Sequence, residues 1–593
     1  MGTASANPAH LFSYSDAATR AARELQDFVR TKVAPAMLAY ARHQECLIPI
    51  DGKVLTRLNA VIATDTWVRT VGQAFLEAGG GGAGGVLMAD RIVVTTDSGL
   101  AAGMVKLAEQ DYRTIGNYRN DPGAAHAALA HLNSLMKENG DDPEFATGLM
   151  RQLGPRGLID LLGKLAVLGS RSGGYGEGAQ AATAQRSLSS LLARATDPSS
   201  PVHLDDDWVS MLDAAAALPV KETAYGEWTG WQLLEPLLQN PSAHFSTPFL
   251  TTFGRDLLDY ERKRSSHGKA PWATPMGNAL PGTNLITPGD AGWDPMIGLL
   301  NALSRNPAAA TFLLDPKRDK SVIEYLTAKR GWPYDYNSSH AGEIALGNAL
   351  RAAAATNASD PAQQRIAAEL VRVLGHDYGG KVSAPLQPAL TDLLSAHIKS
   401  GHVNAAFSDA PDGETPTEFT KKYLQLVMAS LAENPDQYHH LASAEIGYAG
   451  AYFGDSPSLT ASSMAQLLGA LAHGRINGMQ GAYKAADDKH NARVDRISWV
   501  INQALGKVPT KGTAGGLGMQ GVQWLADRAE KSFKQDSSQK AALKSGDLFA
   551  DGQTDLMNAV EKLARKTGHG RSAGALSDEA SKAYSTGYAD AGS

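Results

Sequence analysis

The stretch Met296–Leu314, MIGLLNALSRNPAAATFLL, shows the pattern on which the whole chain is built. In its first half, apolar residues recur at the i, i+3, i+4, i+7 spacing of one helix face: Met296, Leu299, Leu300 and Leu303. Asn306 can cap a second helix, and Pro307 fits the first turn of that helix because its missing N–H has no intrahelical partner. The stretch therefore predicts two helices joined by a short Asn-Pro connection.

The same connection recurs along the chain, at Asp121-Pro122, Asp142-Pro143, Asn240-Pro241 and Asn434-Pro435. The last of these follows another apolar helix face: Leu424, Val427, Met428 and Leu431. This repetition predicts an all-α, multi-lobed protein of stacked helical hairpins, with at most a minor β element. The β-branched segment Arg91–Thr96 is the candidate for a short strand or an extended leg.

Two amphipathic stretches near the N-terminus, Asp16–Glu45 and Val54–Phe75, flank the turn Ile48–Gly52. They predict an antiparallel αα-hairpin. Pro35 is expected to kink or split the first helix near Lys32, because a proline ring clashes with the preceding helical turn.

Composition shifts and segments rich in Gly, Pro or Ser divide the chain into six expected regions. These are a helical hairpin with a glycine hinge (1–100), two helical regions (101–168 and 180–262), a helical domain (296–407), a C-terminal helical region (418–565) and a mobile tail (566–593).

Length, charge and cysteine content limit the function classes. A formal net charge of −6 over 593 residues gives no electrostatic footprint for nucleic acid. Cys46 is the single cysteine, so neither an intrachain disulfide nor a thiolate metal cluster is possible. The most apolar stretch, Leu158–Leu168, is too short for a membrane span and contains charges. Met1–Tyr14 lacks the features of a general secretory signal, so we expect a cytoplasmic protein or export by another route.

Several patterns could indicate metal binding, but each has a simpler interpretation. Asp205–Asp207 lacks the alternating carboxylates of a calcium loop and is expected to cap a helix. His439 and His440 are successive helix residues that point about 100° apart. The pairs His126/His131 and His397/His402 are five residues apart, not the four of a zincin helix. We therefore predict no metal ligands and no cofactor.

Other patterns could indicate catalysis. Gly570–Gly574 matches G-x-S-x-G but has no strand before it, and Gly375–Gly380 is either an active loop or a helix stop with a solvated histidine. The glycine run Gly79–Gly85 follows a helix rather than a strand, and Cys46 with His43 lacks an orienting group. A paired-carboxylate glycosidase stays open as an alternative, with Glu227 beside Trp228 and Trp231 as its best candidate.

Three stretches resemble known families. The N-terminal hairpin, with WVR at 67–69 and VGQAF at 71–75, is similar in architecture to the Trp-X-Gly hairpins of type VII (ESX) secretion substrates, although Trp67 lies within the second helix. The segments DPEFA at 142–146 and LGPRGL at 153–158 resemble a motif of large actinobacterial proteins associated with that pathway. Residues 299–407, with NPAAATFL at 306–313, RGWP at 330–333 and LGNALRAA at 346–353, resemble an uncharacterised all-helical domain of Streptomyces-like bacteria.

The resemblance implies a non-enzymatic helical scaffold or carrier associated with type VII secretion. With the amphipathic hairpin, it suggests that a small helical partner docks as a four-helix bundle. The expected docking residues lie on the second helix: Leu58, Val61, Ile62, Trp67, Val68, Val71 and Phe75. Tyr483–Asp487 matches the Tyr-x-x-x-Asp/Glu export signal of that pathway. Two alternatives stay open, a toxin-like hydrolase with an unrecognised site and a cytoplasmic interaction platform.

Overall fold

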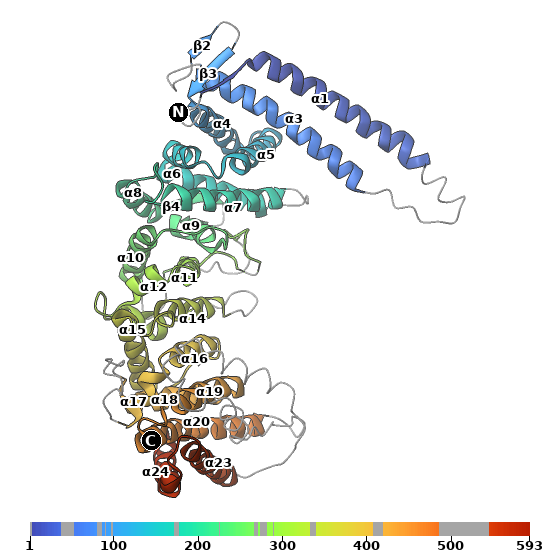
Figure 1. Cartoon of the computed structure of the whole chain (residues 1–593). Helices are drawn as coiled ribbons and strands as arrows, with labels where there is room; N and C mark the ends of the chain where they lie inside the picture. The colour runs from blue at the N-terminus through green and yellow to red at the C-terminus, as the bar shows by residue number, and fades with distance from the viewer. Residues whose placement is uncertain are drawn as a thin grey trace. The chain divides into compact units, whose positions relative to one another are not determined.

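The protein is all-α, as predicted, and its computed structural model is shown in Figure 1. The structure describes residues 3–36, 52–79, 86–88, 91–95, 99–170, 177–223, 226–265, 271–272, 282–288, 290–332, 340–406, 419–485 and 545–592. The chain forms two compact units. Unit 1 comprises Met1–Phe253 and Ala273–Gly298, and unit 2 comprises Gly254–Trp272 and Leu299–Ser593. The division into six regions stays a prediction.

Unit 1 begins with a strand and the N-terminal hairpin and continues through helices and short strands. Its elements are β1 (Thr3–Ala6), α1 (Pro8–Phe28), the π-helical turn η1 (Val29–Val33), α3 (Gly52–Gly79), β2 (Val86–Met88), β3 (Arg91–Thr95), α4 (Gly99–Gly116), α5 (Pro122–Asn139), α6 (Pro143–Ser170), α7 (Glu177–Ala195), α8 (Asp206–Ala216), β4 (Pro219–Thr223), β5 (Gly226–Thr229) and α9 (Gly230–Gln239). Two helices, α10 (Thr247–Arg264) and α11 (Pro295–Ser304), begin in unit 1 and end in unit 2.

Unit 2 consists of helices and helical turns. They are α12 (Pro307–Leu314), α13 (Val322–Glu324), the π-helical turn η2 (Tyr325–Lys329), α14 (Ala341–Ala354), α15 (Pro361–Arg372), the π-helical turn η3 (Val373–Asp377), α16 (Gln387–Ala396), α17 (Ile398–Ala406), α18 (Lys421–Ala432), α19 (Pro435–Tyr452), α20 (Pro457–Ala485), α23 (Ser545–Lys566), the 3-10 turn η5 (Gly570–Ser572) and α24 (Ala573–Asp590).

The helices stack as hairpins within each unit. In unit 1, α4 packs on α5 and α6 packs on α7, and the two pairs meet through α4 on α6 and α5 on α7. In unit 2, α12 packs on α14, α14 on α16 and α16 on α19. Each helix therefore finds its main partners close by in the sequence, which is how stacked hairpins bury apolar faces that one hairpin alone leaves open.

The Asn-Pro and Asp-Pro connections mostly work as predicted. The side-chain oxygen accepts a backbone N–H at the start of the next helix at four of the five sites, over 2.9–3.1 Å: Asp121, Asp142, Asn306 and Asn434. Asn240 differs. It ends α9 and accepts the N–H of Ser242 within a turn, and α10 begins only at Thr247.

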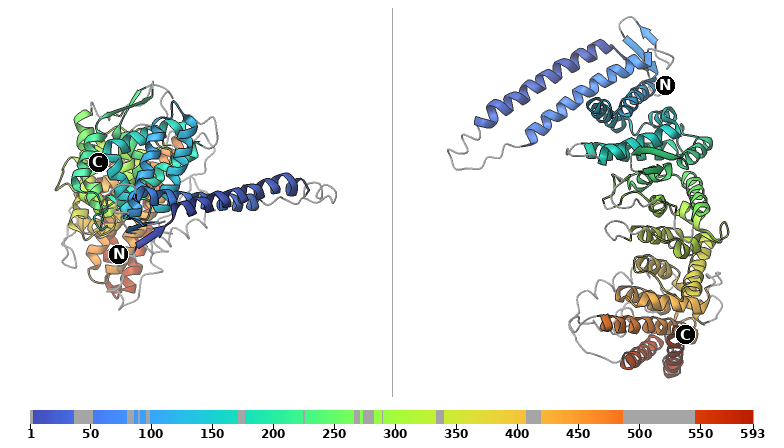
Figure 2. Two further views of the ribbon diagram at one scale, coloured as in Figure 1. Left: turned by 90° about the horizontal axis from the view of Figure 1, so that it is seen from above. Right: turned by 180° about the vertical axis from the view of Figure 1, so that it is seen from behind.

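The N-terminal hairpin is antiparallel. Phe12 of α1 lies against Gly72 of α3. One turn further along α1, Asp16 pairs with Arg69, which lies one turn before Gly72 in α3. The view from behind in Figure 2 shows the two helices side by side. The irregularity expected near Lys32 is present as the π-helical turn η1. In this turn the N–H of Ala34, just before Pro35, donates a hydrogen bond to the carbonyl oxygen of Val29.

The β content is small in the part of the chain that the structure describes. β1, β3 and β2 form an antiparallel sheet in that order, with Thr3 opposite Thr95 and Val86 opposite Val93. β3 lies where the sequence indicated an extended segment. A second antiparallel pair, β4 with β5, precedes α9.

Most of the segment 566–593, for which the sequence predicts a mobile tail, is helical. It contains α24, which packs along α20 and buries Tyr584 completely. The small residues that suggested a tail make this contact possible. A Cβ at Gly587 would lie 2.0 Å from the backbone oxygen of Gln466, and one at Gly469 would lie 2.2 Å from that of Tyr584. Only glycine permits so close an approach of two backbones.

This packing predicts opposite effects for two glycine-to-alanine changes in α24. Gly587→Ala forces the two helices apart and is expected to destabilise their packing by about 1–3 kcal/mol. Gly574→Ala, whose new Cβ would meet nothing within 4 Å, is expected to stabilise α24 by about 0.5–1 kcal/mol. Hydrogen exchange of the α24 amides measures both changes. Equal protection in the two variants would contradict the close packing.

Candidate functional site

The outer face of α1 carries exposed apolar side chains. Tyr14 is 59% exposed, Leu25 is 49% exposed and Phe28 is 55% exposed. With Ala18 and Ala21 they follow a 4-3-4-3 spacing, which keeps them on one side of the helix. We call these five residues the outer stripe.

A second stripe on α1 has the same spacing and faces α3. It contains Phe12, Ser15, Thr19, Ala22 and Gln26, of which Ser15 and Ala22 are buried. Another side of α1 is charged and exposed, with Asp16, Arg20, Arg23 and Asp27. The helix thus has one side that packs on α3, one solvated charged side and one apolar side that faces solvent.

The residues expected to bind a partner lie on more than one side of α3. Phe75 is buried and packs with Ala78 against Ala6, Val71 and Leu100. Ile62, Trp67 and Val68 are half-buried. The side chains of Leu58 and Val61 lie outside the described residues. Docking through this set stays a prediction. The exposed apolar side chains of α1 were not among the expected docking residues, although their 4-3 spacing could have separated them from the stripe that faces α3.

A hydrogen-bonded chain fixes the C-terminal half of α3 on α4 and α5. His131 Nε2 lies 3.1 Å from Thr70 Oγ1, and its Nδ1 lies 2.8 Å from Asp111 Oδ2. Burial raises the pKa of Asp111, and the hydrogen bond and charge of His131 partly offset that rise. Beside this chain, α3 and α4 touch so closely that a Cβ at Gly103 would lie 2.3 Å from the oxygen of Ala74.

Thr70, His131 and Asp111 follow the hydroxyl–imidazole–carboxylate order of a hydrolase triad. However, Thr70 is only 6% exposed and lies inside α3, where backbone N–H groups are engaged along the helix. Such N–H groups cannot serve as the preorganised donors that acyl transfer needs for an oxyanion. This geometry favours a structural link between three helices over a catalytic triad.

The Gly375–Gly380 segment is a helix stop. Its first residues form the π-helical turn η3, and Gly379 and Gly380 follow with positive φ angles of 58° and 83°. His376 is exposed, and its Nδ1 lies 2.5 Å from Asp377 Oδ1.

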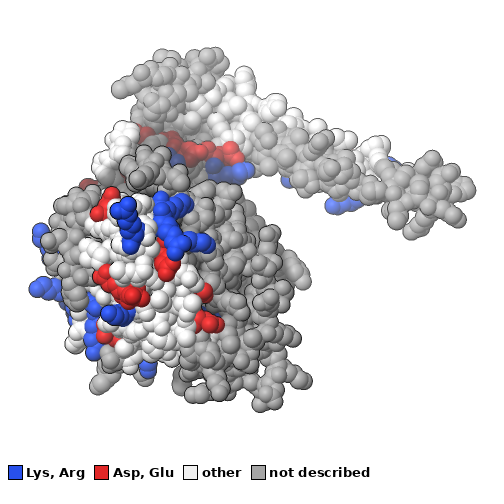
Figure 3. Space-filling view, turned by 60° about the horizontal axis from the view of Figure 1, so that its bottom comes forward, with Lys and Arg blue, Asp and Glu red and all other residues white. Residues whose placement is uncertain are grey.

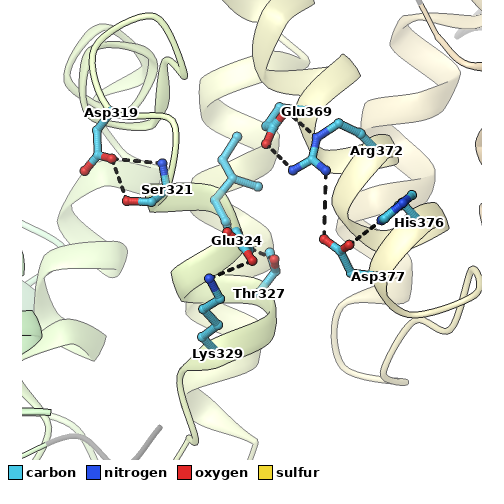
Figure 4. Close-up of polar contacts among 10 residues, drawn as sticks. Asp319, Ser321, Glu324, Thr327, Lys329, Glu369, Arg372, His376 and Asp377 are labelled. Carbon is cyan, nitrogen blue, oxygen red and sulfur yellow. Dashed lines mark hydrogen bonds and ion pairs between the residues drawn. The ribbon is translucent and has the colours of Figure 1, made fainter. Parts of the chain in front are cut away.

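Figure 4 shows the ion pairs around this stop. Arg372 pairs with both oxygens of Glu369 over 2.7 and 2.9 Å and approaches Asp377 to 3.9 Å. In η2, Lys329 pairs with Glu324 at 2.7 Å. The acidic groups here are therefore matched by nearby cations and do not present unmatched charge to a substrate.

The glycosidase candidates do not form a sugar-binding surface. Trp228 and Trp231 are buried, and Trp231 packs edge-on against Phe253 with 5.0 Å between the ring centroids. They belong to the core around α9, all of whose residues are buried. The side chain of Glu227 lies outside the described residues.

The metal candidates mostly have structural partners. Asp205 caps α8 by accepting the N–H of Trp208 at 2.9 Å. His439 is buried beside Tyr438, whereas His440 approaches Asp392 at 3.7 Å. Of the described residues, no group of three or more His, Cys, Asp or Glu is placed to hold a metal ion.

The five-apart histidine pairs are likewise separated. His397 Nε2 lies 2.7 Å from the Ala354 carbonyl oxygen, and burial lowers its pKa. His402 forms a buried pair with Glu445, with 2.5 Å between Nδ1 and Oε1. His126 approaches the side-chain amide of Gln180, whereas His131 contacts Asp111 and Thr70.

The remaining motifs carry no site that the structure describes. Ser572 of the G-x-S-x-G match lies in η5 between two helices and donates to the oxygen of His569, so no strand-to-helix nucleophile elbow is formed. Cys46, His43 and the glycine run after Gly79 lie outside the described residues, as do Asp487 and the side chain of Tyr483.

Unit 1 contains a buried acidic cluster that the sequence did not reveal. Gln239 Nε2 hydrogen-bonds to both Glu235 and Asp290, and Asn284 also donates to Asp290. Burial, and then the negative charge of Asp290, raises the pKa of Glu235 well above its usual value. Glu235 is completely buried, so its ionised form is disfavoured in the folded protein.

Unit 2 contains a buried ion pair, between Glu261 and Arg330. Arg330 donates to both carboxylate oxygens over 2.8 Å, and the carboxylate also accepts from Tyr325 and Trp272 at 2.6 Å. Burial by itself would raise the pKa of Glu261, but the charge and hydrogen bonds of Arg330, with those of Tyr325 and Trp272, lower it. Burial and Glu261 raise the pKa of Tyr325 to about 12.

Comparison of the chain with models of protein families, with curated proteins and with solved structures gives no match in any of the three. None of the described helices is both long and apolar enough to cross a membrane. On the face shown in Figure 3, the described acidic and basic side chains lie interspersed.

Glu235→Gln is expected to stabilise the protein in a pH-dependent way. Because the pKa of Glu235 is raised on folding, unfolding releases a proton above the usual carboxyl pKa, and the wild-type protein loses stability as pH rises. The gain should be about 1–3 kcal/mol at neutral pH and close to zero below about pH 4. Urea denaturation across this range measures it. Exposed Glu138→Gln is the control, and the same pH profile in both variants would contradict the assignment.

Glu261→Ala is expected to destabilise unit 2 by about 3–5 kcal/mol, because it leaves Arg330 buried without its counter-charge. The matched change in an exposed pair, Glu561→Ala beside Arg565, should cost less than about 1 kcal/mol. Since the pKa of Glu261 is lowered on folding, its contribution is present above the usual carboxyl pKa and is lost as pH falls through the lowered value. Hydrogen exchange in α10 and η2 measures the difference in stability between the two variants. If Glu261→Ala costs no more stability than Glu561→Ala, the buried ion pair does not have the expected role.

Proposed function

We propose that this protein works by binding other proteins and that the N-terminal hairpin is a binding module. The observation that carries the proposal is the outer stripe, because Tyr14, Leu25 and Phe28 are each about half exposed on a helix that already has a packed side. Apolar side chains aligned along one exposed helix face are typical of a protein interaction surface.

The spacing of the outer stripe favours a helical occupant. Apolar residues at alternating steps of four and three fit the knobs-into-holes packing of a neighbouring helix. A helical hairpin docked on α1 and α3 would complete a four-helix bundle. Burial of three large side chains contributes on the order of 5 kcal/mol. A binding free energy of that size corresponds to a Kd on the order of 0.1 mM, so we expect a weak, transient complex.

We further propose that the partner is a small helical protein of a type VII secretion system and that the chain is a scaffold or carrier in that pathway. The support is the resemblance of the N-terminal hairpin and of residues 299–407 to proteins of that pathway. The hairpin architecture is compatible with it. On this proposal the protein is exported without a general signal peptide. A cytoplasmic platform that uses the same surface is the alternative.

A toxin-like hydrolase is the second candidate function, and the chain of Thr70, His131 and Asp111 is the observation that favours it. We place it second because the hydroxyl is nearly buried. If the site is catalytic, a serine-hydrolase probe should label Thr70, and Thr70→Val should abolish the labelling. If these three residues only link the helices, the probe does not label the wild-type protein.

Replacement of Leu25 and Phe28 by Glu is expected to abolish partner binding, because two charges in the outer stripe cannot be buried against a helix without a large penalty. The helix content should not change, since both side chains are exposed. Met211→Glu, at an exposed apolar residue of α8 (54% exposed), is the matched control. Pull-down from cells with an intact type VII system measures capture of the small helical protein.

Capture by the wild-type chain and Met211→Glu, but not by the double variant, is the expected result. Equal capture by all three would exclude the outer stripe. Fractionation with and without the secretion ATPase then separates a carrier, whose export stops, from a cytoplasmic platform, whose location does not change.

A further inference from the structure

A groove of about 490 Å³ lies between the first turns of α20 and the side of α24 in unit 2. Its polar lining includes Ser458, Ser462 and Gln466, which are four residues apart and so share one face of α20, and Glu579 of α24. Pro457 and Leu459 add an apolar part. The volume is in the range of sites for small molecules or single side chains.

The hydroxyl groups of the groove point their protons at Glu579. Ser458 Oγ lies 2.8 and 2.6 Å from the two carboxylate oxygens, and Ser462 Oγ lies 3.0 Å from one of them. Each hydroxyl has one proton, so both are used in this way. The lone pairs of the serine oxygens and two lone pairs of the carboxylate remain available to a ligand.

Gln466 adds a further acceptor. Its Oε1 is buried and has no hydrogen-bond partner among the described residues. A buried carbonyl oxygen without a donor is unfavourable by about 1–3 kcal/mol, so a ligand that donates to it gains the missing interaction. The groove therefore offers acceptors and few donors.

The charge of the groove excludes an anion. The N-terminus of a helix favours negative charge, but Glu579 already lies against the first turns of α20. A second anion would be repelled.

We propose that this groove binds a guanidinium or primary ammonium group, as presented by an Arg or Lys side chain of a peptide. The cation donates to Glu579 and to Gln466 Oε1, and its methylene stem lies against Pro457 and Leu459, as the stems of long basic side chains do on apolar surfaces. Charge-assisted hydrogen bonds to a carboxylate are the strongest that such a group can make. The site is independent of the outer stripe of α1.

The test is titration of the full chain with Nα-acetyl-arginine amide and with its neutral isostere, Nα-acetyl-citrulline amide, followed by NMR chemical shifts. We expect a Kd of about 1 mM for the arginine compound and binding at least about tenfold weaker for the citrulline compound. Equal binding of the two, or no saturable binding of the arginine compound by about 10 mM, would overturn the proposal.

Two variants localise the site. Glu579→Gln keeps an acceptor for Ser458 but removes the charge, and it should weaken arginine binding at least about tenfold. Asp578→Asn removes a charge that does not line the groove, and it should change binding less than about twofold. If Glu579→Gln disturbs the packing of α24, as judged by hydrogen exchange, the Gln466→Met variant is tested in its place. This variant should weaken arginine binding several-fold. Wild-type affinity in the lining variant would overturn the assignment.

Discussion

The packing of α3 on α4 in unit 1, and of α20 on α18 and α24 in unit 2, depends on backbone contacts that only glycine allows. Among the described glycines, a Cβ would lie 2.3 Å or less from a backbone oxygen in or at the end of a neighbouring helix at Gly103, Gly469, Gly474, Gly478 and Gly587. Each contact fixes how far apart two helices lie and which faces meet. The buried Leu and Ala side chains then fill the remaining space at the density of a protein interior. The groove beside Glu579 lies along the same pair of helices that Gly469 and Gly587 hold together.

Polar ties complement these contacts where apolar packing alone leaves the arrangement undetermined. Glu261 binds Arg330, Tyr325 and Trp272, and it thereby joins α10 to the first residue of η2 and to Arg330, which follows η2. A buried ion pair contributes little net stability compared with apolar residues of the same volume. Its hydrogen bonds are directional, however, and they can form in only one arrangement of the helices. The same reasoning applies to His131, whose two ring nitrogens reach different helices.

The sequence predicted the local structure better than the candidate site. The helix starts at Asn306 and Asn434 depend on hydrogen bonds to residues no more than three positions away, so they could be predicted without knowledge of the fold. The role of residues 566–593 could not, because Ala and Gly are typical of both a tail and a close helix contact. Partners such as Glu261 and Arg330 are far apart in the chain, and no local pattern links them. The outer stripe of α1 was detectable, but only by distinguishing two interleaved 4-3 patterns one residue apart.

The pairing of α20 with α24 has a consequence for how the chain is made. Ser458 and Glu579 meet across 121 residues, whereas most helices of the stack meet close neighbours. During synthesis, the helices before α20 can assemble as they leave the ribosome. The Gly469 side of α20 has to wait for α24 to emerge. In that interval a bare, small-residue helix surface is open to other nascent chains, so this late closure is the step at which we expect chaperones to act on the protein.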